Sequence, residues 1–399
     1  MLGILKPMLS RELNWSEAEY GWIAFSFQGA YGLMLLLAGR ALDLIGTRAG
    51  FAIAITVWSL AGMAHAFARS AGGFAVARFA LGAGEAANFP AAIKTVAEWF
   101  PVRERALAIG ILNSGSNVGA IVAPLAVPVI ALAWGWQAAF LATGAVGFLW
   151  LALWLWFYRR PEEHPRLAPA ELALIRGGRE AGAPLPPVPW GHLFSVRATW
   201  VFAIGKFLTD PVWWFYLFWL PGFLDRTHGL NLLEMGIPLI TIYLAADVGS
   251  IAGGWLSSSL LKRGWSLNAA RKTTMLLCAV AVVPVMLVSR LGDNLWATVS
   301  VISLATAAHQ GWSTNLFTLV SDLVPARAVG SVVGIGGTAG AVSGMLTSPL
   351  IGYWLDWSDG AYGVVFLSFG TMYLIALGII HLLVPRFEPA EHPQPKGSL

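Results

Sequence analysis

The sequence predicts an all-α polytopic membrane protein made of two similar helical halves. Hydrophobic residues make up 57% of the 399 residues and charged residues only 12%, about half the charged share of a soluble domain. A chain with so little charge cannot cover a surface that faces water, so its main solvent must be the lipid bilayer. The one cysteine, Cys278, excludes an internal disulfide, and the sequence offers no metal cluster. The small net charge of +4 forms no basic stripe, so we expect no nucleic-acid partner.

Apolar runs long enough to cross a bilayer, which takes about 20 residues, recur along the chain. The tetrapeptide Ser16-Glu17-Ala18-Glu19 fits a capping box, which predicts that the first of these helices starts near Glu17. The eleven predicted spans cover residues 20–42, 49–68, 72–97, 104–130, 137–158, 198–224, 236–261, 273–291, 294–320, 328–355 and 361–384.

The loops between these spans predict the orientation and the domain organisation. Most Lys and Arg residues lie in the loops on one side, which the positive-inside rule makes cytoplasmic. The longest polar segment contains seven prolines, a density typical of a linker rather than of a folded domain. We therefore expect an N-terminal helical bundle over 1–158, a cytoplasmic linker over 159–197, a C-terminal bundle over 198–385 and a cytoplasmic tail over 386–399.

The two halves resemble each other in sequence. The stretch from Gly39 to Arg48 follows the first span, and the similar stretch from Gly254 to Gly264 lies about 215 residues later (254 − 39). Arg105-Ala106 and Arg327-Ala328 each open a Gly/Ser-rich span. Parallel repeats of this kind are typical of transporters whose substrate site lies between the halves.

The stretch from Gly39 to Arg48 resembles the loop after the second helix of the major facilitator superfamily. A glycine allows two helices to approach closely, and Asp43 can cap a helix end and pair with a basic residue. Gly39, Asp43, Gly46 and Arg48 are therefore predicted to form a conformational latch. An ordinary charged turn is the alternative reading.

Further motifs narrow the resemblance to the anion:cation symporters of that superfamily. Arg78, Glu85 and Pro90, followed by Trp99-Phe100-Pro101, resemble the fourth helix of these proteins. Other runs are similar to bacterial hexuronate transporters, and together they extend the resemblance over nearly the whole chain: Asn113 to Gly119, Lys206 to Trp214, Ala246 to Gly249, and His309-Gln310.

The resemblance implies a fold, an activity and a location. The fold is the major facilitator fold of two pseudo-symmetric bundles, and the activity is proton-coupled symport of an organic anion by alternating access. The expected substrate is a small sugar acid, namely a hexuronate such as glucuronate or galacturonate. The protein would be a multi-pass protein of the bacterial inner (cytoplasmic) membrane and a monomer. It would have no tightly bound cofactor and no enzymatic activity.

The number of spans departs from the family pattern. The family has twelve helices, and the first predicted span here matches the family's second. Residues 1–13 are too short to replace the family's first helix, which carries a charged substrate or proton site. We therefore expect that the native protein begins upstream and includes one more helix.

Two charged residues of the first half are candidates for the central chemistry. Charges at membrane depth cost at least about 2.5–3.5 kcal/mol on insertion scales, so they indicate function by default. Glu85 is predicted to exchange the coupling proton, and a permanent structural pair with Arg78 is the alternative. Arg78 can bind a carboxylate through two parallel donors, gate Glu85, or extend its charge to the membrane surface.

The remaining candidates come from both halves. Lys206 is predicted to attract the anionic substrate, unless its ammonium reaches the interface instead. Asp247 is predicted to be a second proton site or a latch, and Asp210-Pro211 predicts a broken helix that faces a cavity. The resemblance aligns Tyr31 with an aromatic substrate residue. The residues expected to stack on or hydrogen-bond to a polyol are Trp213, Trp214, His309, Gln310 and Asn315.

Three alternative functions are set against this prediction. The first is symport of another carboxylate, such as an aldonate, glucarate or an aromatic acid. The second is a membrane-embedded enzyme, which the absence of HExxH and GxSxG motifs from the sequence disfavours. The third is a transporter-like sensor. Gly334 to Gly340 superficially matches a dinucleotide-binding motif, but no strand precedes it, and close helix packing explains it better.

Overall fold

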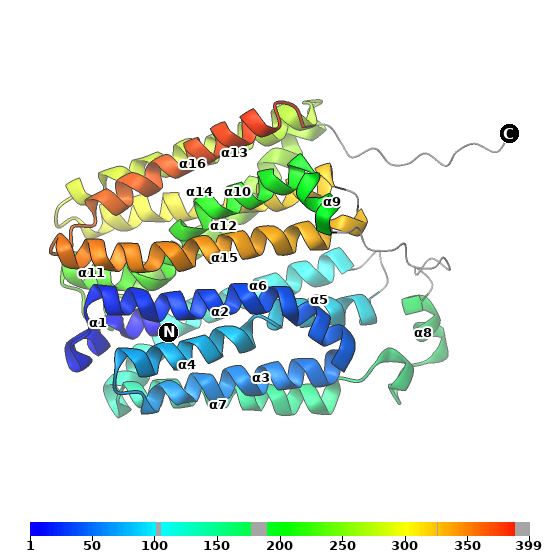
Figure 1. Cartoon of the computed structure of the whole chain (residues 1–399), viewed down its shortest axis with the longest axis horizontal. Helices are drawn as coiled ribbons and strands as arrows, with labels where there is room; N and C mark the ends of the chain where they lie inside the picture. Colours follow the sequence, from blue (N-terminus) through cyan, green and yellow to red (C-terminus); the bar gives the residue numbers. More distant parts are fainter. Residues whose placement is uncertain (101–104, 177–189, 325, 388–399) are drawn as a thin grey trace. The chain divides into compact units, whose positions relative to one another are not determined.

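The computed structural model describes residues 1–100, 105–176, 190–324 and 326–387, and the regular structure of these residues is helical (Figure 1). The chain divides into two compact units. Unit 1 comprises Met1–Pro184 with Ser348–Tyr353, and unit 2 comprises Leu185–Thr347 with Trp354–Leu399.

Unit 1 contains the helices of the first half. Its elements are α1 (Leu2–Leu13), α2 (Glu17–Ile45), α3 (Thr47–Ala64), η1 (His65–Phe67), α4 (Ala71–Glu85), α5 (Asn88–Trp99), α6 (Arg105–Trp134), α7 (Trp136–Phe157), η3 (Pro161–Glu163) and α8 (Pro169–Arg176).

Unit 2 contains the helices of the second half, with the exception that the segment Ser348–Tyr353 of α15 groups with unit 1. Its elements are α9 (Trp190–Ser195), α10 (Arg197–Phe218), α11 (Leu220–His228), α12 (Gly236–Lys262), α13 (Leu267–Val282), η4 (Val283–Arg290), α14 (Leu295–Leu323), α15 (Ala326–Trp357) and α16 (Gly363–Leu383).

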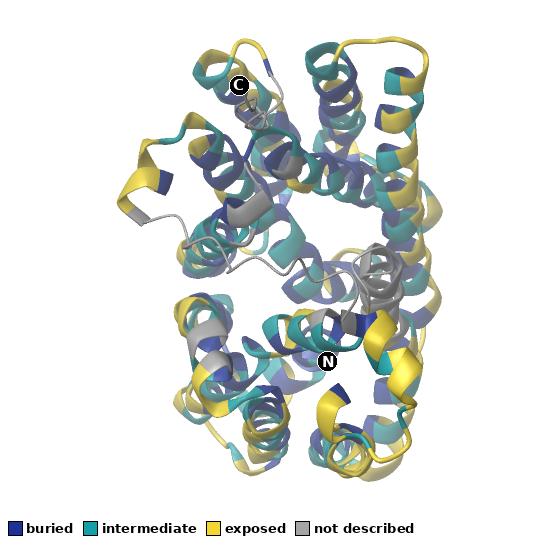
Figure 2. Ribbon diagram, turned by 90° about the vertical axis from the view of Figure 1, so that its right-hand side faces the viewer, coloured by how far each residue is buried: buried dark blue, intermediate teal, exposed yellow. Residues whose placement is uncertain are grey.

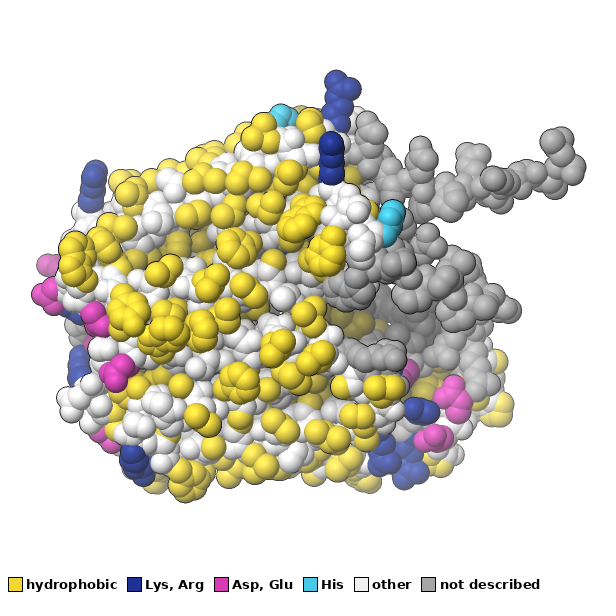
Figure 3. All heavy atoms as spheres, in the orientation of Figure 1, with side chains coloured by type: hydrophobic (Ala, Val, Ile, Leu, Met, Phe, Trp, Pro, Cys, Tyr) yellow, Lys and Arg dark blue, Asp and Glu magenta, His cyan; other side chains and the backbone are white. Residues whose placement is uncertain are grey.

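The surface is typical of a protein that lies in a bilayer. Hydrophobic side chains cover most of the face shown in Figure 3, and charged side chains lie near its two ends. Within the described residues, six helical segments are long and apolar enough to cross a membrane: Glu17–Ala38, Thr47–Phe67, Trp136–Phe157, Gly236–Lys262, Leu267–Arg290 and Gly363–Leu383. The predicted span 72–97 is not among them, because it is divided between α4 and α5, which have 15 and 12 residues.

The start of α2 confirms the predicted capping box. Ser16 Oγ accepts from the Glu19 amide at 3.0 Å, and Glu19 Oε2 accepts from the Ser16 amide at 2.9 Å. No span is predicted before this point, but Leu2–Leu13 forms α1, a helix of 12 residues. This segment carries Lys6 and is shorter than the about 20 residues that a membrane-spanning helix needs, but the helix buries most of its residues inside unit 1.

Proline explains why the predicted span 72–97 is two helices rather than one. Pro90 has no N–H and its ring crowds the carbonyl four residues earlier, at Ala86. The helix α4 therefore ends at Glu85, and α5 begins at Asn88. Proline marks two other interruptions in the same way: Pro221 at the start of α11, and Pro284 where α13 gives way to η4.

The prediction that Asp210-Pro211 breaks its helix is wrong. The helix α10 runs without interruption from Arg197 to Phe218. Pro211 cannot donate to the carbonyl of Phe207, but the hydroxyl of Ser343 on α15 donates to that oxygen instead. The backbone group that proline frees is therefore satisfied by a neighbouring helix, as lipid requires.

Within each unit the helices pack side by side, with exposed residues on the outward faces (Figure 2). In unit 2, α12 packs closely on α14. A Cβ added at Gly249 would lie 2.1 Å from the carbonyl oxygen of Ala307, and one at Gly253 would lie 2.5 Å from the Cα of Gly311. These glycines let the two backbones approach, as small residues do in membrane helices.

Candidate functional site

The helix α4 carries Arg78 and Glu85 and lies very close to its neighbours. A Cβ at Gly82 would lie 2.4 Å from the carbonyl oxygen of Phe27 on α2, and one at Gly84 would lie 2.7 Å from the amide nitrogen of Trp58 on α3. The two glycines therefore place α4 directly against both backbones. Glu85 is the last residue of α4 and is half-buried at the break in the helix.

Arg78 lies in an aromatic environment inside unit 1. Its side chain is buried, with only 8% of the residue exposed. The guanidinium carbon lies 5.2 Å from the centre of the Phe27 ring, within the range of a cation–π interaction. Phe27 in turn stacks on Tyr31, with ring centres 5.9 Å apart and an interplanar angle of 23°. Phe27 thus joins the two predicted site residues Arg78 and Tyr31.

Glu85 shares a helix face with Arg78, as the spacing predicts. Seven residues correspond to two helical turns, or about 10 Å along the axis. The carboxylate therefore lies at the broken end of α4, and the guanidinium lies deeper in the same helix.

A second buried cation of unit 1 was not among the predicted site residues. Lys6 on α1 is only 2% exposed. Its Nζ atom lies 2.5 Å from Glu17 Oε2 and 5.0 Å from the centre of the Tyr20 ring. The ion pair joins α1 to the first turn of α2. No spacing rule could have found it, because the partners belong to two different helices.

The predicted latch is only partly within the described side chains. Those of Gly39 and Asp43 lie outside them. Gly46 joins α2 to α3 with a φ of 87°, a conformation that favours glycine. Arg48 Nη2 donates to the carbonyl of Leu155 at 2.6 Å, near the end of α7. These contacts hold the α2–α3 turn against α7 within unit 1.

Lys94 on α5 contacts the end of α2. Its Nζ atom donates to the carbonyl of Leu42 at 3.0 Å, in the last turn of α2. A positive charge at this position stabilises the negative end of the helix dipole.

The end of α5 is held by a hydrogen-bonded carboxylate. Glu98 accepts from Thr47 Oγ1 at 2.6 Å and from the hydroxyl of Tyr158. Burial raises the pKa of Tyr158, and the hydrogen bond to Glu98 raises it further. Tyr158 therefore stays protonated and remains a donor. The contact fixes the ends of α5 and α7 to the start of α3.

Lys206 in unit 2 forms an ion pair on its own helix. Its Nζ atom lies 2.8 Å from Asp210 Oδ2, and the two side chains are 12% and 14% exposed. The ammonium also lies 5.1 Å from the centre of the Phe317 ring on α14. The spacing of four residues is one that places a Lys and an Asp side by side on a helix, so the sequence carried a signal for this pair. The prediction named Lys206 as a substrate residue and did not pair it with Asp210.

Glycines of α15 make room for this pair. A Cβ at Gly340 would lie 2.0 Å from Asp210 Oδ2, and one at Gly344 would lie 2.3 Å from Cδ1 of Trp214. Gly336 is filled in the same way by Phe202. The glycine-rich segment 334–340 therefore receives side chains of α10. This arrangement agrees with the predicted role in close helix packing.

Trp213 and His309, both predicted site residues, are in direct contact. Their rings are stacked, with centres 5.4 Å apart and an interplanar angle of 4°. His309 Nδ1 lies 2.5 Å from the hydroxyl oxygen of Tyr373 on α16. Trp213 lies one turn beyond Asp210 on the same face of α10. Lys206, Asp210, Trp213 and His309 therefore form one cluster in unit 2.

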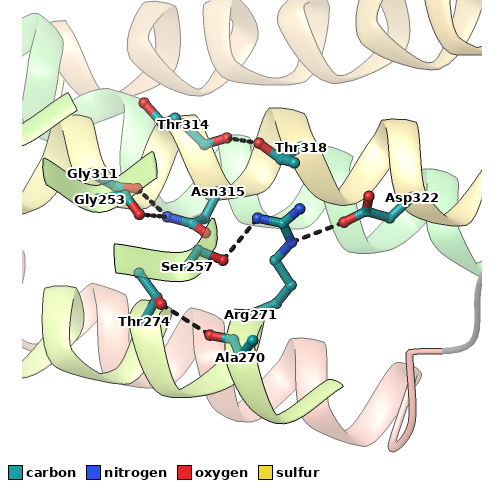
Figure 4. Close-up of polar contacts among 10 residues, drawn as sticks. All are labelled: Gly253, Ser257, Ala270, Arg271, Thr274, Gly311, Thr314, Asn315, Thr318 and Asp322. Carbon is teal, nitrogen blue, oxygen red and sulfur yellow. Dashed lines mark hydrogen bonds and ion pairs between the residues drawn. The ribbon is translucent and has the colours of Figure 1, made fainter. Parts of the chain in front are cut away.

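Asn315 is held in the packing interface between α12 and α14 (Figure 4). Its amide nitrogen donates to the carbonyls of Gly253 at 3.2 Å and Gly311 at 2.9 Å. Nearby, Arg271 donates to Asp322 at 2.9 Å and to Ser257 at 2.7 Å. This network ties α12, α13 and α14 together, and the side-chain N–H groups of Asn315, a predicted partner of a polyol, donate to backbone carbonyls instead.

The remaining predicted site residues of unit 2 are Trp214, Gln310 and Asp247. Trp214 stacks on Phe218, with ring centres 5.7 Å apart, and lies against Gly344 of α15. Gln310 follows His309 on α14 and is half-buried, and Asp247 is half-buried on α12. In the described part of the chain, no group of three or more His, Cys, Asp or Glu residues is arranged to hold a metal ion.

Comparisons with known proteins agree with this architecture. The family model of the Major Facilitator Superfamily matches residues 1–348. The hexuronate transporter of Escherichia coli strain K12 is 34% identical over 355 residues, which cover 88% of this chain and 82% of that protein. The galacturonate transporter of Dickeya chrysanthemi is 35% identical over 283 residues, covering 69% of this chain and 81% of that protein.

A solved structure supports the fold at lower identity. It is a bacterial homologue of the human lysosomal transporter Spinster, in an inward-facing and occupied conformation. Its TM-score is 0.72 at 18% identity, and the match covers 98% of this chain and 94% of that chain. At this identity the likeness concerns the fold alone.

The glycine at position 340 can be tested against a matched glycine of the same helix. Gly340→Ala should lower the unfolding midpoint in detergent, because its methyl group would overlap Asp210 and overpacking costs about 1–3 kcal/mol. Gly334→Ala is the control, since nothing lies within 4 Å of its added Cβ. Equal midpoints for the two variants would contradict the assigned contact between α10 and α15.

Proposed function

Because the chain belongs to the major facilitator superfamily, we propose that it transports an organic anion, and specifically that it is a proton-coupled symporter of a hexuronate. The substrate would be glucuronate or galacturonate, and the mechanism would be alternating access. The observation that carries the proposal is the 34% identity to a hexuronate transporter over 88% of this chain. The chain is a multi-pass membrane protein, which we propose works as a monomer in the bacterial cytoplasmic membrane.

The buried cations support an anionic substrate. Arg78 in unit 1 and Lys206 in unit 2 both lie within helices, beside aromatic rings. A guanidinium presents two parallel donors to a planar carboxylate. A sugar acid also carries hydroxyl groups, for which Tyr31, Trp213, His309 and Gln310 are proposed partners. Trp214 and Asn315 are less suited, because one faces α15 and the other donates to backbone carbonyls.

Two further roles complete the proposal. Glu85 would carry the coupling proton, with Asp247 as a second proton site. Gly39, Asp43, Gly46 and Arg48 would form a latch that breaks and re-forms during the transport cycle.

Uptake of labelled acids into proteoliposomes tests the proposal directly. Purified protein should accumulate galacturonate or glucuronate when the pH outside is lower than inside, and accumulation should collapse with a protonophore. The panel should include an aldonate, glucarate and an aromatic acid, which are the alternative carboxylates. Preferential uptake of one of these acids would identify that acid, rather than a hexuronate, as the substrate. Binding without flux would instead indicate a sensor.

The roles of the two cations can be separated by titration of galacturonate. Arg78→Lys keeps the charge but loses the guanidinium fork, so the dissociation constant should rise about 10–100-fold, the usual effect of losing a charge-assisted hydrogen bond. Lys206→Gln alone would leave Asp210 buried without its ion-pair partner, which is strongly destabilising. The double variant Lys206→Gln with Asp210→Asn is the cleaner test, and it should stay folded and bind galacturonate weakly.

Lys262→Gln is the matched control, because Lys262 is an exposed cation at the end of α12. Its dissociation constant should equal that of the wild type. Wild-type affinity in the double variant would show that Lys206 serves only to neutralise Asp210.

The coupling role of Glu85 predicts a separation of two transport modes. Glu85→Gln resembles the protonated carboxyl in shape. The variant should lose uptake driven by a pH gradient but keep exchange of labelled for unlabelled substrate at equal pH, since exchange needs only reorientation of the loaded protein. Both modes are measured in the same proteoliposomes. Continued accumulation driven by the gradient would place the coupling proton elsewhere, with Asp247 as the next candidate.

A further inference from the structure

The environment of His309 in unit 2 contains a residue that sequence reasoning did not find. His309 is 3% exposed, and its imidazole lies between two aromatic residues from different helices. Trp213 of α10 stacks on one face of the ring at 5.4 Å. Tyr373 of α16 stands against it at an interplanar angle of 89°, with ring centres 6.0 Å apart. The Tyr373 hydroxyl oxygen lies 2.5 Å from His309 Nδ1.

Tyr373 is itself held rigidly. The residue is fully buried, and its ring packs edge-on against Trp312, with centres 5.5 Å apart and an interplanar angle of 84°. A buried aromatic side chain fixed in this way can orient a hydrogen-bond partner at little cost in entropy. Its hydroxyl group needs a partner when buried, and His309 supplies it.

We propose that Tyr373 is a positioning residue for substrate recognition. Its hydroxyl donates to Nδ1 of His309, which fixes the ring orientation and leaves the proton on Nε2. The Nε2–H group and the stacked Trp213 then present a preorganised surface for the hydroxyl and carboxylate oxygens of a sugar acid. Because a neutral imidazole has one donor and one acceptor nitrogen, the hydrogen bond at Nδ1 decides what Nε2 can offer.

The proposal rests on the proposed function and extends it to a helix that carries none of the predicted site residues. Two observations make the arrangement more than core packing. The stacked partner Trp213 is only half-buried, and it shares a face of α10 with Lys206 and Asp210, the charged pair of this unit. By fixing His309, the Tyr373 hydroxyl therefore also fixes Trp213, which lies next to the Lys206–Asp210 pair on α10.

Tyr373→Phe removes only the hydroxyl group and tests the proposal. The KM for galacturonate uptake should rise about 2–10-fold, the effect expected from one neutral hydrogen bond, while kcat and the unfolding midpoint change little. Tyr216→Phe is the matched control. Its hydroxyl is also buried in unit 2 but has no hydrogen-bond partner among the described residues, so its KM should stay at the wild-type value.

A double-mutant cycle shows whether Tyr373 acts through His309. In the background of His309→Gln, the change Tyr373→Phe should cause no further rise in KM. A rise equal to that seen in the wild-type background would overturn the proposal, because it would mean that Tyr373 acts independently of His309.

Nuclear magnetic resonance of the histidine nitrogens provides a test that needs no Tyr373 variant. His309, assigned by its loss in His309→Gln, should be a single neutral tautomer with the proton on Nε2, and the Nε2 signal should shift when galacturonate binds. A proton on Nδ1, averaged tautomers, or a signal indifferent to bound substrate would each contradict the proposal. If the wild type binds no hexuronate, the proposed function fails, whereas the tautomer is still measured without substrate.

Discussion

A charge in the apolar interior of a membrane helix bundle must find its partner inside the protein, and this constraint governs the structure around the candidate site. The cost of leaving such a charge alone is several kcal/mol. The buried cations meet the constraint in different ways. Lys6 pairs with Glu17 across two helices, Lys206 pairs with Asp210 on one helix, and Arg78 lies over an aromatic ring. Each solution fixes the position of a charged group inside the protein.

Glycine and proline make these solutions possible. Close approach at Gly82 brings the backbone of α2 against α4, so that Phe27 can cover Arg78. The space at Gly340 accepts the carboxylate of Asp210. Pro90 ends α4 after Glu85, whereas Pro211 leaves α10 intact because Ser343 satisfies the carbonyl that the proline frees. The same residue type therefore breaks one helix and not the other, depending on its neighbours.

The aromatic residues have two separable roles. Some pack the interior, as Trp214 does against Phe218 and Gly344 of α15. Others hold a polar group, as Trp213 and Tyr373 hold His309. Trp213 and Trp214 are adjacent in sequence, but successive residues of a helix point about 100° apart. They consequently face different helices, and a sequence motif that contains both residues does not show this difference.

The sequence by itself determined the fold class, the start of α2 and the family, because these depend on composition, local hydrogen bonding at Ser16 and Glu19, and motifs within single helices. It also predicted Arg78, Glu85, Lys206 and His309 as candidates, since polar groups are conspicuous in apolar spans. Only the tertiary structure decided which partners they have. Tyr373 lies on another helix from His309, and Asn315 is occupied by backbone carbonyls of Gly253 and Gly311. Contacts between helices depend on how the helices pack, and the spacing of residues along the chain does not determine which residues of two helices meet.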